Sequence, residues 1–231
     1  MSIFEVSRHF DEIAGEYDAS IPTHVRDHYL HRRAKLVGKL SRKGHKLLEI
    51  GCGTRLLAKE LADSGHIVFG LDVSLEMLKI GQPNFRENFV VGDSSGLPFR
   101  SNSFDLTLCI ATLHHIAEPH TVCKSIQEMA RVTKPDGRVV VIDHNPLNPY
   151  WPILMKRVPQ DCGNERLIPL SEILKDVEIS GAKAVEWWRT GFTPDFMPRA
   201  LLPLWMIIEH LIESIPGLRK LCAHNVIVFQ K

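Results

Sequence analysis

A short glycine-rich stretch, EIGCGT (49–54), is the first place where the sequence could do chemistry. It ends the apolar run HKLLEIG (45–51) and precedes a helical pattern, so Gly51 and Gly53 lie at a strand-to-helix turn. Glycines at such a turn let a ligand approach the backbone, and the free N–H groups of the following helix face it. The stretch therefore predicts a turn that binds a nucleotide-like cofactor.

Asp72 supports this interpretation. It follows Gly53 by nineteen residues, at the end of the next apolar run, where a carboxylate can accept hydrogen bonds from both ribose hydroxyls. The GxGxxG pattern of dinucleotide-binding folds is incomplete, because Leu56 stands at its third glycine. A nicotinamide-dependent oxidoreductase is therefore an alternative function whose characteristic GxGxxG motif the sequence lacks.

Three histidines are the candidates for acid–base catalysis. His114 and His115 follow the apolar run 104–112, and His144 ends the run 137–144. Imidazole has a pKa near neutral pH, which suits a general base. The alternative is that one of the adjacent pair is a satisfied helix-start residue while the other faces solvent.

No metal site is expected. Asp143, His144 and Asn145 match no ligand spacing, and adjacent residues at a strand end point in different directions. The five cysteines form no CxxC pair. Their odd number and the lack of a signal-peptide pattern favour reduced thiols and a cytoplasmic location.

The composition limits the partners. The chain has 231 residues, 44% of them hydrophobic and 24% charged, with a net charge of +1. So small a charge argues against a nucleic-acid partner, whose binding needs clustered Lys and Arg. We expect a small-molecule substrate, and the sequence leaves the oligomeric state open.

The elements that position these residues alternate along the chain. Helical patterns over 3–19 and 23–40 form an N-terminal cap, residues 1–41. The expected strands are 45–51, 66–73, 87–93, 104–112 and 137–144, and the helices between them are 54–65, 75–81 and about 120–132. Gly65 stops one of these helices and Ser74 caps another. Strands apolar on both faces indicate a parallel sheet with a ligand site beyond its carboxyl ends.

The last third differs in pattern. A helix is expected over 170–182 and strands over 184–190 and 224–231. Between the two strands lies an apolar, helix-prone insertion, residues 192–220. Extra core packed on the sheet is its default use; a lid over an apolar substrate, or a surface that meets a membrane or a partner subunit, are alternatives. Membrane contact is not predicted.

Taken together, EIGCGT, GLDVS, GDSSGLPF, SFDLTLCIATLHHI and RVTKPDGRVVVID resemble the class I S-adenosylmethionine-dependent methyltransferases. The likeness covers roughly residues 4–145 and is strongest to the subgroup that includes the ubiquinone and menaquinone biosynthetic enzymes. It implies one α/β domain, 1–231, with a doubly wound, mostly parallel, Rossmann-like sheet of seven strands. The strands at 184–190 and 224–231 would form its antiparallel C-terminal hairpin.

The resemblance also implies S-adenosyl-L-methionine as cofactor and assigns its contacts. Asp72 matches the ribose-binding acid, and Asp93, with Ser94 beside it, matches the position that reads the adenine amino group. Tyr17 matches an aromatic residue close to the cofactor, although plain helix packing is an equal alternative. Cys52 is included among the cofactor residues, although a small buried side chain is its simplest interpretation. The full set of expected cofactor-binding residues is Tyr17, Glu49, Gly51, Cys52, Gly53, Asp72, Val73, Asp93, Ser94 and Ile110.

Arg55 departs from the family pattern, in which this position is glycine. We expect a mild consequence, because the chain there should be entering helix geometry, where a side chain is tolerated. The expected reaction is in-line methyl transfer to oxygen or carbon of a small, apolar or lipid-linked acceptor. The rival, motivated by Arg55, is an inactive protein of the same fold that only binds the cofactor.

Overall fold

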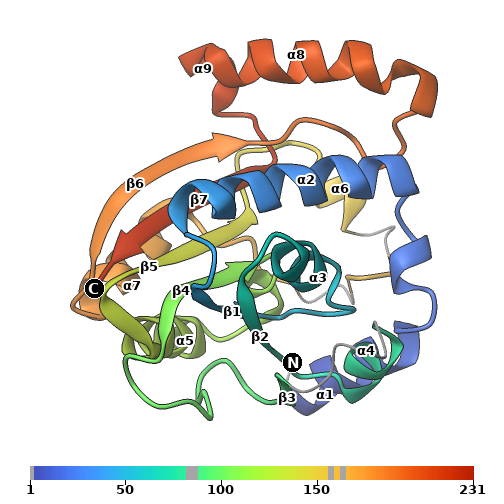
Figure 1. Ribbon diagram of the computed structural model, residues 1–231. Coiled ribbons are helices and arrows are strands. Elements are labelled where there is room, and N and C mark those ends of the chain that lie inside the picture. The colour runs from blue at the N-terminus through green and yellow to red at the C-terminus, as the bar shows by residue number, and fades with distance from the viewer. Residues whose placement is uncertain (1–2, 82–87, 156–158, 162–164) are drawn as a thin grey trace.

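The computed structural model describes residues 3–81, 88–155, 159–161 and 165–231. Its centre is a seven-stranded sheet in the order β3-β2-β1-β4-β5-β7-β6 (Figure 1). The strands are β1 (Lys46–Ile50), β2 (Ile67–Asp72), β3 (Phe89–Val91), β4 (Phe104–Ile110), β5 (Thr133–His144), β6 (Lys183–Thr190) and β7 (His224–Gln230). Neighbours from β3 to β5 are parallel, whereas β7 runs antiparallel to β5 and β6. The predicted fold, with its C-terminal hairpin, is confirmed.

Some helices cover the two faces of the sheet and others lie outside these layers (Figure 1). The helices are α1 (Ile3–Ile13), α2 (Thr23–Leu40), α3 (Leu56–Asp63), α4 (Leu75–Ile80), α5 (Pro119–Val132), α6 (Trp151–Leu154), α7 (Leu170–Ile179), α8 (Leu202–Ser214) and α9 (Pro216–Arg219). One core lies between the sheet and α5 and α7, and a second lies between the sheet and α2 and α3. The expected cap of α4 is present, because Oγ of Ser74 accepts from N–H of Met77.

Alternation along the strands decides which side chains reach which core. In β1, Leu48 and Ile50 pack on the α5–α7 side, and Leu47 packs on the α2–α3 side. Glu49 shares the direction of Leu47, because successive side chains of a strand point to opposite faces. It is buried there, near Arg33 of α2.

Some boundaries differ from those expected. The first helix ends at Ile13, and the rest of the expected 3–19 segment is a turn followed by the 3-10 helix η1 (Tyr17–Ala19). β5 begins at Thr133, which pairs with Phe104 before a register shift. Helix α6 had no clear sequence signal. Residue 87 of the expected third strand and Cys162 lie outside the described residues.

The insertion does not add to the core of the sheet, which was its default interpretation. Helix α8 lies beyond α2 at the edge of the molecule (Figure 1). Its only buried residue is Glu209, whereas four of its eight large apolar side chains are exposed and the other four are half-buried. Apolar content alone could not decide this, because it does not say which face points inward. No helix in the described part of the chain is long and apolar enough to cross a membrane.

Candidate functional site

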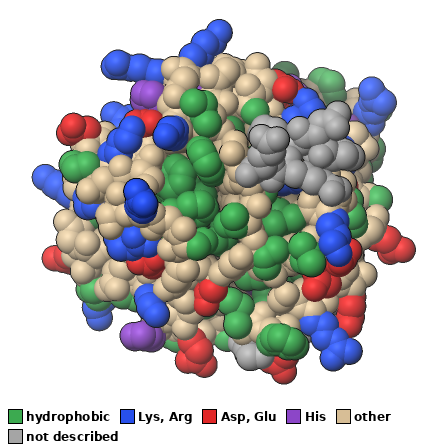
Figure 2. Space-filling view, turned by 60° about the horizontal axis from the view of Figure 1, so that its bottom comes forward, with side chains coloured by type: hydrophobic (Ala, Val, Ile, Leu, Met, Phe, Trp, Pro, Cys, Tyr) green, Lys and Arg blue, Asp and Glu red, His purple; other side chains and the backbone are tan. Residues whose placement is uncertain are grey.

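A cavity of about 340 Å³ opens at the carboxyl ends of the parallel strands. The turn after β1, the end of β2, the loop after β3 and the turn after β4 all contribute to its wall. Helix α1 forms the remaining side with Ile3, Val6 and Phe10. Figure 2 views the molecule from the side of α1 and α4, and hydrophobic side chains gather near the middle of that face. The cavity therefore lies where the sequence predicts a ligand site.

The glycine turn forms the floor of this cavity. Gly51 and Gly53 have φ of +69° and +48°, which is left-handed backbone that favours glycine. An ideal Cβ at Gly51 would lie 2.2 Å from Oγ1 of Thr112, so a side chain does not fit there. The corresponding position at Gly53 has no atom within 4 Å. The turn thus presents bare backbone to an open space, which is the fit that a nucleoside cofactor needs.

Two of the expected carboxylates line the cavity. Asp72 accepts hydrogen bonds from the N–H of Gly53 at 2.7 Å and of Ser74 at 2.9 Å, and burial raises its pKa. Asp93 accepts from the N–H and the hydroxyl of Ser95, both at 2.8 Å. These bonds fix both carboxylates in place before any ligand arrives.

Other expected residues divide between the cavity and the core. Tyr17, Val73 and Ser94 line the cavity together with the two glycines and the two aspartates. Glu49, Cys52 and Ile110 do not line it, and all three are buried. Glu49 faces α2, where burial raises its pKa to about 8 and Arg33 opposes that shift.

Arg55 adopts a conformation that the sequence did not predict. Its φ is +67°, and it precedes α3 rather than continuing it, so the expectation of helix geometry is wrong. A non-glycine residue in this region costs roughly 1–2 kcal/mol. The side chain is fully buried and its guanidinium lies 5.1 Å from the ring centroid of Phe89. It does not line the cavity, so the cofactor space is left clear.

The N-terminal helix is tied to the cavity by hydrogen bonds that no motif indicated. Ser7 donates to the carbonyl of Val73 at 2.9 Å. Asp11 accepts from the hydroxyl of Ser74 at 2.6 Å. In the next turn, Asp18 accepts from the hydroxyl of Thr54 at 2.8 Å. These bonds hold α1 and η1 against the ends of β1 and β2, which makes α1 a fixed wall of the site.

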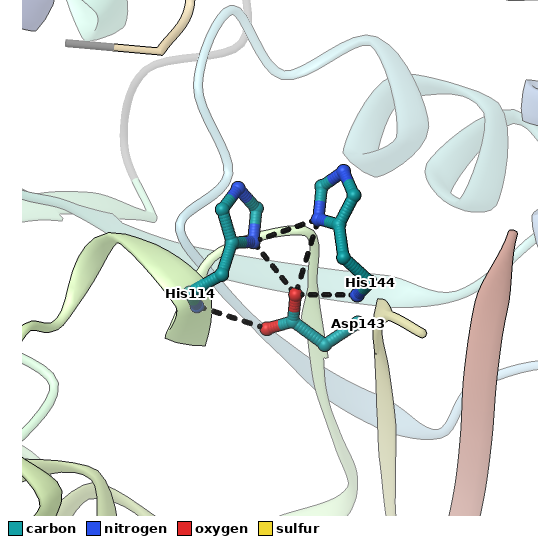
Figure 3. Close-up of side chains that lie close together, drawn as sticks. All are labelled: His114, Asp143 and His144. Carbon is teal, nitrogen blue, oxygen red and sulfur yellow. Dashed lines mark hydrogen bonds and ion pairs between the residues drawn. The ribbon is translucent and has the colours of Figure 1, made fainter. Parts of the chain in front are cut away.

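Two of the three histidines, His114 and His144, meet around one carboxylate, Asp143 (Figure 3). Nδ1 of His114 donates to Oδ1 of Asp143 at 2.6 Å, and Nδ1 of His144 lies 2.9 Å from the same His114 nitrogen. The other oxygen of Asp143 accepts from the backbone N–H of His114 at 3.2 Å. The sequence placed these residues at neighbouring strand ends but missed that Asp143 joins them.

Only His115 of the three lines the cavity, through the 3-10 turn η2 (Leu113–His115). Its ring packs edge-on against Phe10, 5.0 Å between centroids, and lies 4.0 Å from the ring of His114. Its buried Nδ1 has no hydrogen-bond partner in the described part of the chain; Oε1 of Glu165 is 3.7 Å away. His115 therefore places an imidazole ring on the cavity wall, with its Nδ1 turned towards Glu165.

The protonation states of the histidines differ. Burial, together with a charge on His114, lowers the pKa of His115 to about 4 and that of His144 to about 3. Burial also opposes charge on His114, but the Asp143 carboxylate outweighs it and raises the pKa of His114. At neutral pH, His115 is thus a neutral imidazole, and its lowered pKa makes it a weaker base than an exposed histidine.

Ligand atoms of His114, Asp143 and His144 come within 4.8 Å of one another, as do those of His114, His115 and Asp161. In the first group these atoms already bind each other, since Nδ1 of both histidines faces Oδ1 of Asp143. In the second group, Nε2 of His114 lies 4.0 Å from Asp161. The hydrogen bonds account for the first group without an ion.

Comparison with known proteins places this site in context. Residues 48–141 match a family described as a methyltransferase domain. A demethylmenaquinone methyltransferase of Paenarthrobacter aurescens (strain TC1) is 35% identical over 150 residues, which make up 64% of this chain and 58% of that relative. The enzyme of the same name from Renibacterium salmoninarum is 34% identical over 163 residues, 67% of this chain and 68% of that relative.

Solved structures show the same fold. A SAM-dependent methyltransferase from Archaeoglobus fulgidus superposes with a TM-score of 0.67 at 15% identity, covering 89% of this chain and 94% of that one. The match extends well beyond residues 48–141, so it includes the C-terminal region that the family match leaves out.

Proposed function

This chain belongs to the class I S-adenosylmethionine-dependent methyltransferases, and on that premise we propose that it methylates oxygen or carbon of a small apolar acceptor. The observation that carries the proposal is the cavity, in which a bare glycine turn, two fixed carboxylates and one neutral imidazole face the same space. That combination suits a nucleoside cofactor on one side and an acceptor that must lose a proton on the other.

Gly51 and Gly53 would hold the methionine and ribose parts of the cofactor, with Asp72 accepting from the ribose hydroxyls. Asp93 would accept from the adenine amino group, since its carboxylate lies on the same cavity wall. Tyr17 completes this side as an aromatic wall. Glu49 and Cys52 support the turn from behind rather than touching the cofactor, because both lie outside the cavity.

The acceptor side is apolar. Phe10 of α1 packs against His115, and Ile3, Val6 and Ile116 line the same cavity. Apolar side chains exclude water, so a ring with a hydrophobic substituent is a better occupant than a charged metabolite. The names of the two curated relatives point to a demethylated quinone, which fits this wall.

The cofactor supplies an activated methyl group, whose bond to sulfur breaks as the bond to the acceptor forms. The chain's own residues align the acceptor and exclude water, which provides much of the rate enhancement. His115 takes the proton that the acceptor loses. His114, which is held by its hydrogen bond to Asp143, packs against the ring of His115. We propose that this reaction needs no metal ion.

Two measurements test the proposal. Calorimetric titration with S-adenosylmethionine should give saturable binding, and a demethylated quinone with a short prenyl chain should accept a radiolabelled methyl group from it. Binding of the cofactor without methylation of any quinone, phenol or other apolar acceptor in a broad screen would favour the inactive rival.

A further inference from the structure

Helix α8 differs from an ordinary surface helix in the side chains that it buries and the side chains that it exposes. In a soluble protein the apolar side of a surface helix faces the core and its charges face water. In α8 the most buried residue is a carboxylate, Glu209, and Glu213 is half-buried beside it, together with Trp205, Ile208 and Ile212. Glu209 is fully buried, whereas Ile207 remains 60% exposed.

Hydrogen bonds hold the carboxylates on the inner side. Glu209 accepts from Arg32 at 2.6 Å and His28 at 2.8 Å, both on α2, and from the N–H of Phe192 at 2.6 Å. Glu213 accepts from the N–H of Gly191 at 2.7 Å. The helix is therefore anchored by polar bonds, and its orientation is fixed.

The outer side is a continuous apolar surface, which we call the α8 stripe. It comprises Phe196, Leu201, Leu204, Met206, Ile207, Leu211, Ile215, Leu218 and Leu221, all exposed. Within α8, positions 204, 207 and 211 follow the spacing of three and four residues that aligns side chains along one side of a helix. Ile215 lies at the break between α8 and α9, and Leu218 lies on α9. An exposed apolar surface of this extent marks a site that meets an apolar medium.

The exposed charges within residues 196–221 are all cationic, and the half-buried Asp195 precedes this segment. Arg199 lies before its helix, and Arg219 and Lys220 lie after it, all exposed. Between Phe196 and Leu221 the only acidic residues are the two that are bound inward. Two copies of the chain that paired through the stripe would bring together cationic ends without a carboxylate between them, which disfavours self-association.

From this we infer that α8 and α9 dock the protein on an anionic phospholipid surface, lying in the headgroup region without crossing the bilayer. The stripe enters the boundary of the acyl chains, and the flanking cations contact lipid phosphates, an arrangement typical of interfacial helices. The inference does not depend on the proposed reaction, since docking needs neither cofactor nor acceptor.

Vesicle sedimentation tests this with the full chain. The protein should bind vesicles of phosphatidylcholine and phosphatidylglycerol, and bind vesicles of phosphatidylcholine alone much more weakly. Ile207→Ser should weaken binding about tenfold, because a side chain of this size gains about 1.5 kcal/mol or more on burial. The matched control is Ile179→Ser on α7, which is 52% exposed and lies outside the stripe, and it should bind as the wild type does.

The cationic ends are tested separately. Arg219→Gln should weaken binding to the anionic vesicles about fivefold and leave binding to neutral ones unchanged, since each basic residue near such a surface contributes about 1 kcal/mol. The inference is overturned if the wild type binds no vesicles. It is also overturned if light scattering shows a dimer that Ile207→Ser converts to a monomer, because the stripe would then be a contact between two copies.

Discussion

Two buried networks in this protein share their chemistry and differ in their surroundings. Behind the cavity, His114 donates to Asp143 at 2.6 Å; between α2 and α8, His28 donates to Glu209 at 2.8 Å. The first network touches the ring of His115, which faces the cavity, whereas the second includes Arg32 and carries a surface helix. A buried imidazole–carboxylate pair therefore does not by itself identify a catalytic site, and the cavity beside the first network is what distinguishes it from the second.

The difference also predicts what each network contributes. The network at Glu209 holds α8 against α2, so its loss should lower the free energy of unfolding. The network at Asp143 orients His114, whose ring lies against His115 beside the cavity, so its loss should lower the rate of methyl transfer. Variants of the two regions can separate these roles.

The largest effect is expected for Glu209→Ala. The change leaves His28 and Arg32 without their shared acceptor, and breaking a buried ion pair costs about 3 kcal/mol. Denaturant titration should show that loss, while the cofactor affinity of the folded protein stays unchanged. A loss of cofactor affinity equal to the loss of stability would show that the two regions are not separate.

The same network predicts a pH dependence. Burial alone would raise the pKa of Glu209, but the hydrogen bond from His28 and the charge of Arg32 lower it to about 2. A depressed folded-state pKa stabilises the protein above the unfolded value, near 4.5, and this contribution is lost as the pH falls towards 2. Between these pH values, the wild type should lose more stability than Glu209→Ala in acid titrations followed by circular dichroism.

On the cavity side, His115→Asn should lower kcat about 100-fold, as expected when a general base is lost. The cofactor dissociation constant should stay within a factor of about three, since the imidazole faces the acceptor. His120→Asn, an exposed histidine nearby, is the matched control. Unchanged turnover in His115→Asn would mean that the acceptor needs no base or finds another.

A smaller effect, on binding alone, is expected for Asp72→Asn. The N–H groups of Gly53 and Ser74 donate to different oxygens of Asp72, so the amide keeps the acceptor of only one of them, and it also removes the charge that favours the ribose hydroxyls. Affinity for S-adenosylmethionine should fall about tenfold, the equivalent of 1.4 kcal/mol for a charged hydrogen bond. An unchanged dissociation constant in calorimetry would contradict the ribose assignment.

The smallest effect is expected for Ile207→Ala in α8. Because this side chain is mostly exposed, the free energy of unfolding should change by less than about 0.5 kcal/mol. Met129→Ala in α5, a fully buried position, should instead cost about 3 kcal/mol. Similar costs at both positions would show that the α8 stripe is covered within the folded chain.

Much of the fold could be predicted because its signals are local. Strands such as 104–112 are apolar on both faces, and Ser74 marks a helix start by its own hydrogen bond. The insertion could not be placed, because its inward side depends on His28 and Arg32, which lie far away in the sequence. Composition shows that a helix is apolar, whereas residues distant in the sequence determine which of its sides faces the protein.

The site shows the same division. Gly51, Gly53, Asp72 and Asp93 come together because parallel strands end at one edge, which a strand pattern already implies. The left-handed backbone of Arg55 could not be foreseen, because it depends on packing against Phe89 across the sheet. Glu49 was expected at the cofactor, but strand alternation turns it towards α2.

The close approach of Gly51 to Thr112 makes the ends of β1 and β4 a single mechanical unit. Thr112 leads directly into the turn that carries His115, so we expect a displacement of the glycine bend to move the imidazole as well. Binding of the cofactor and alignment of the acceptor should therefore both depend on the contact between the glycine turn and Thr112. The two ligands should bind cooperatively, each raising the affinity for the other by the same factor.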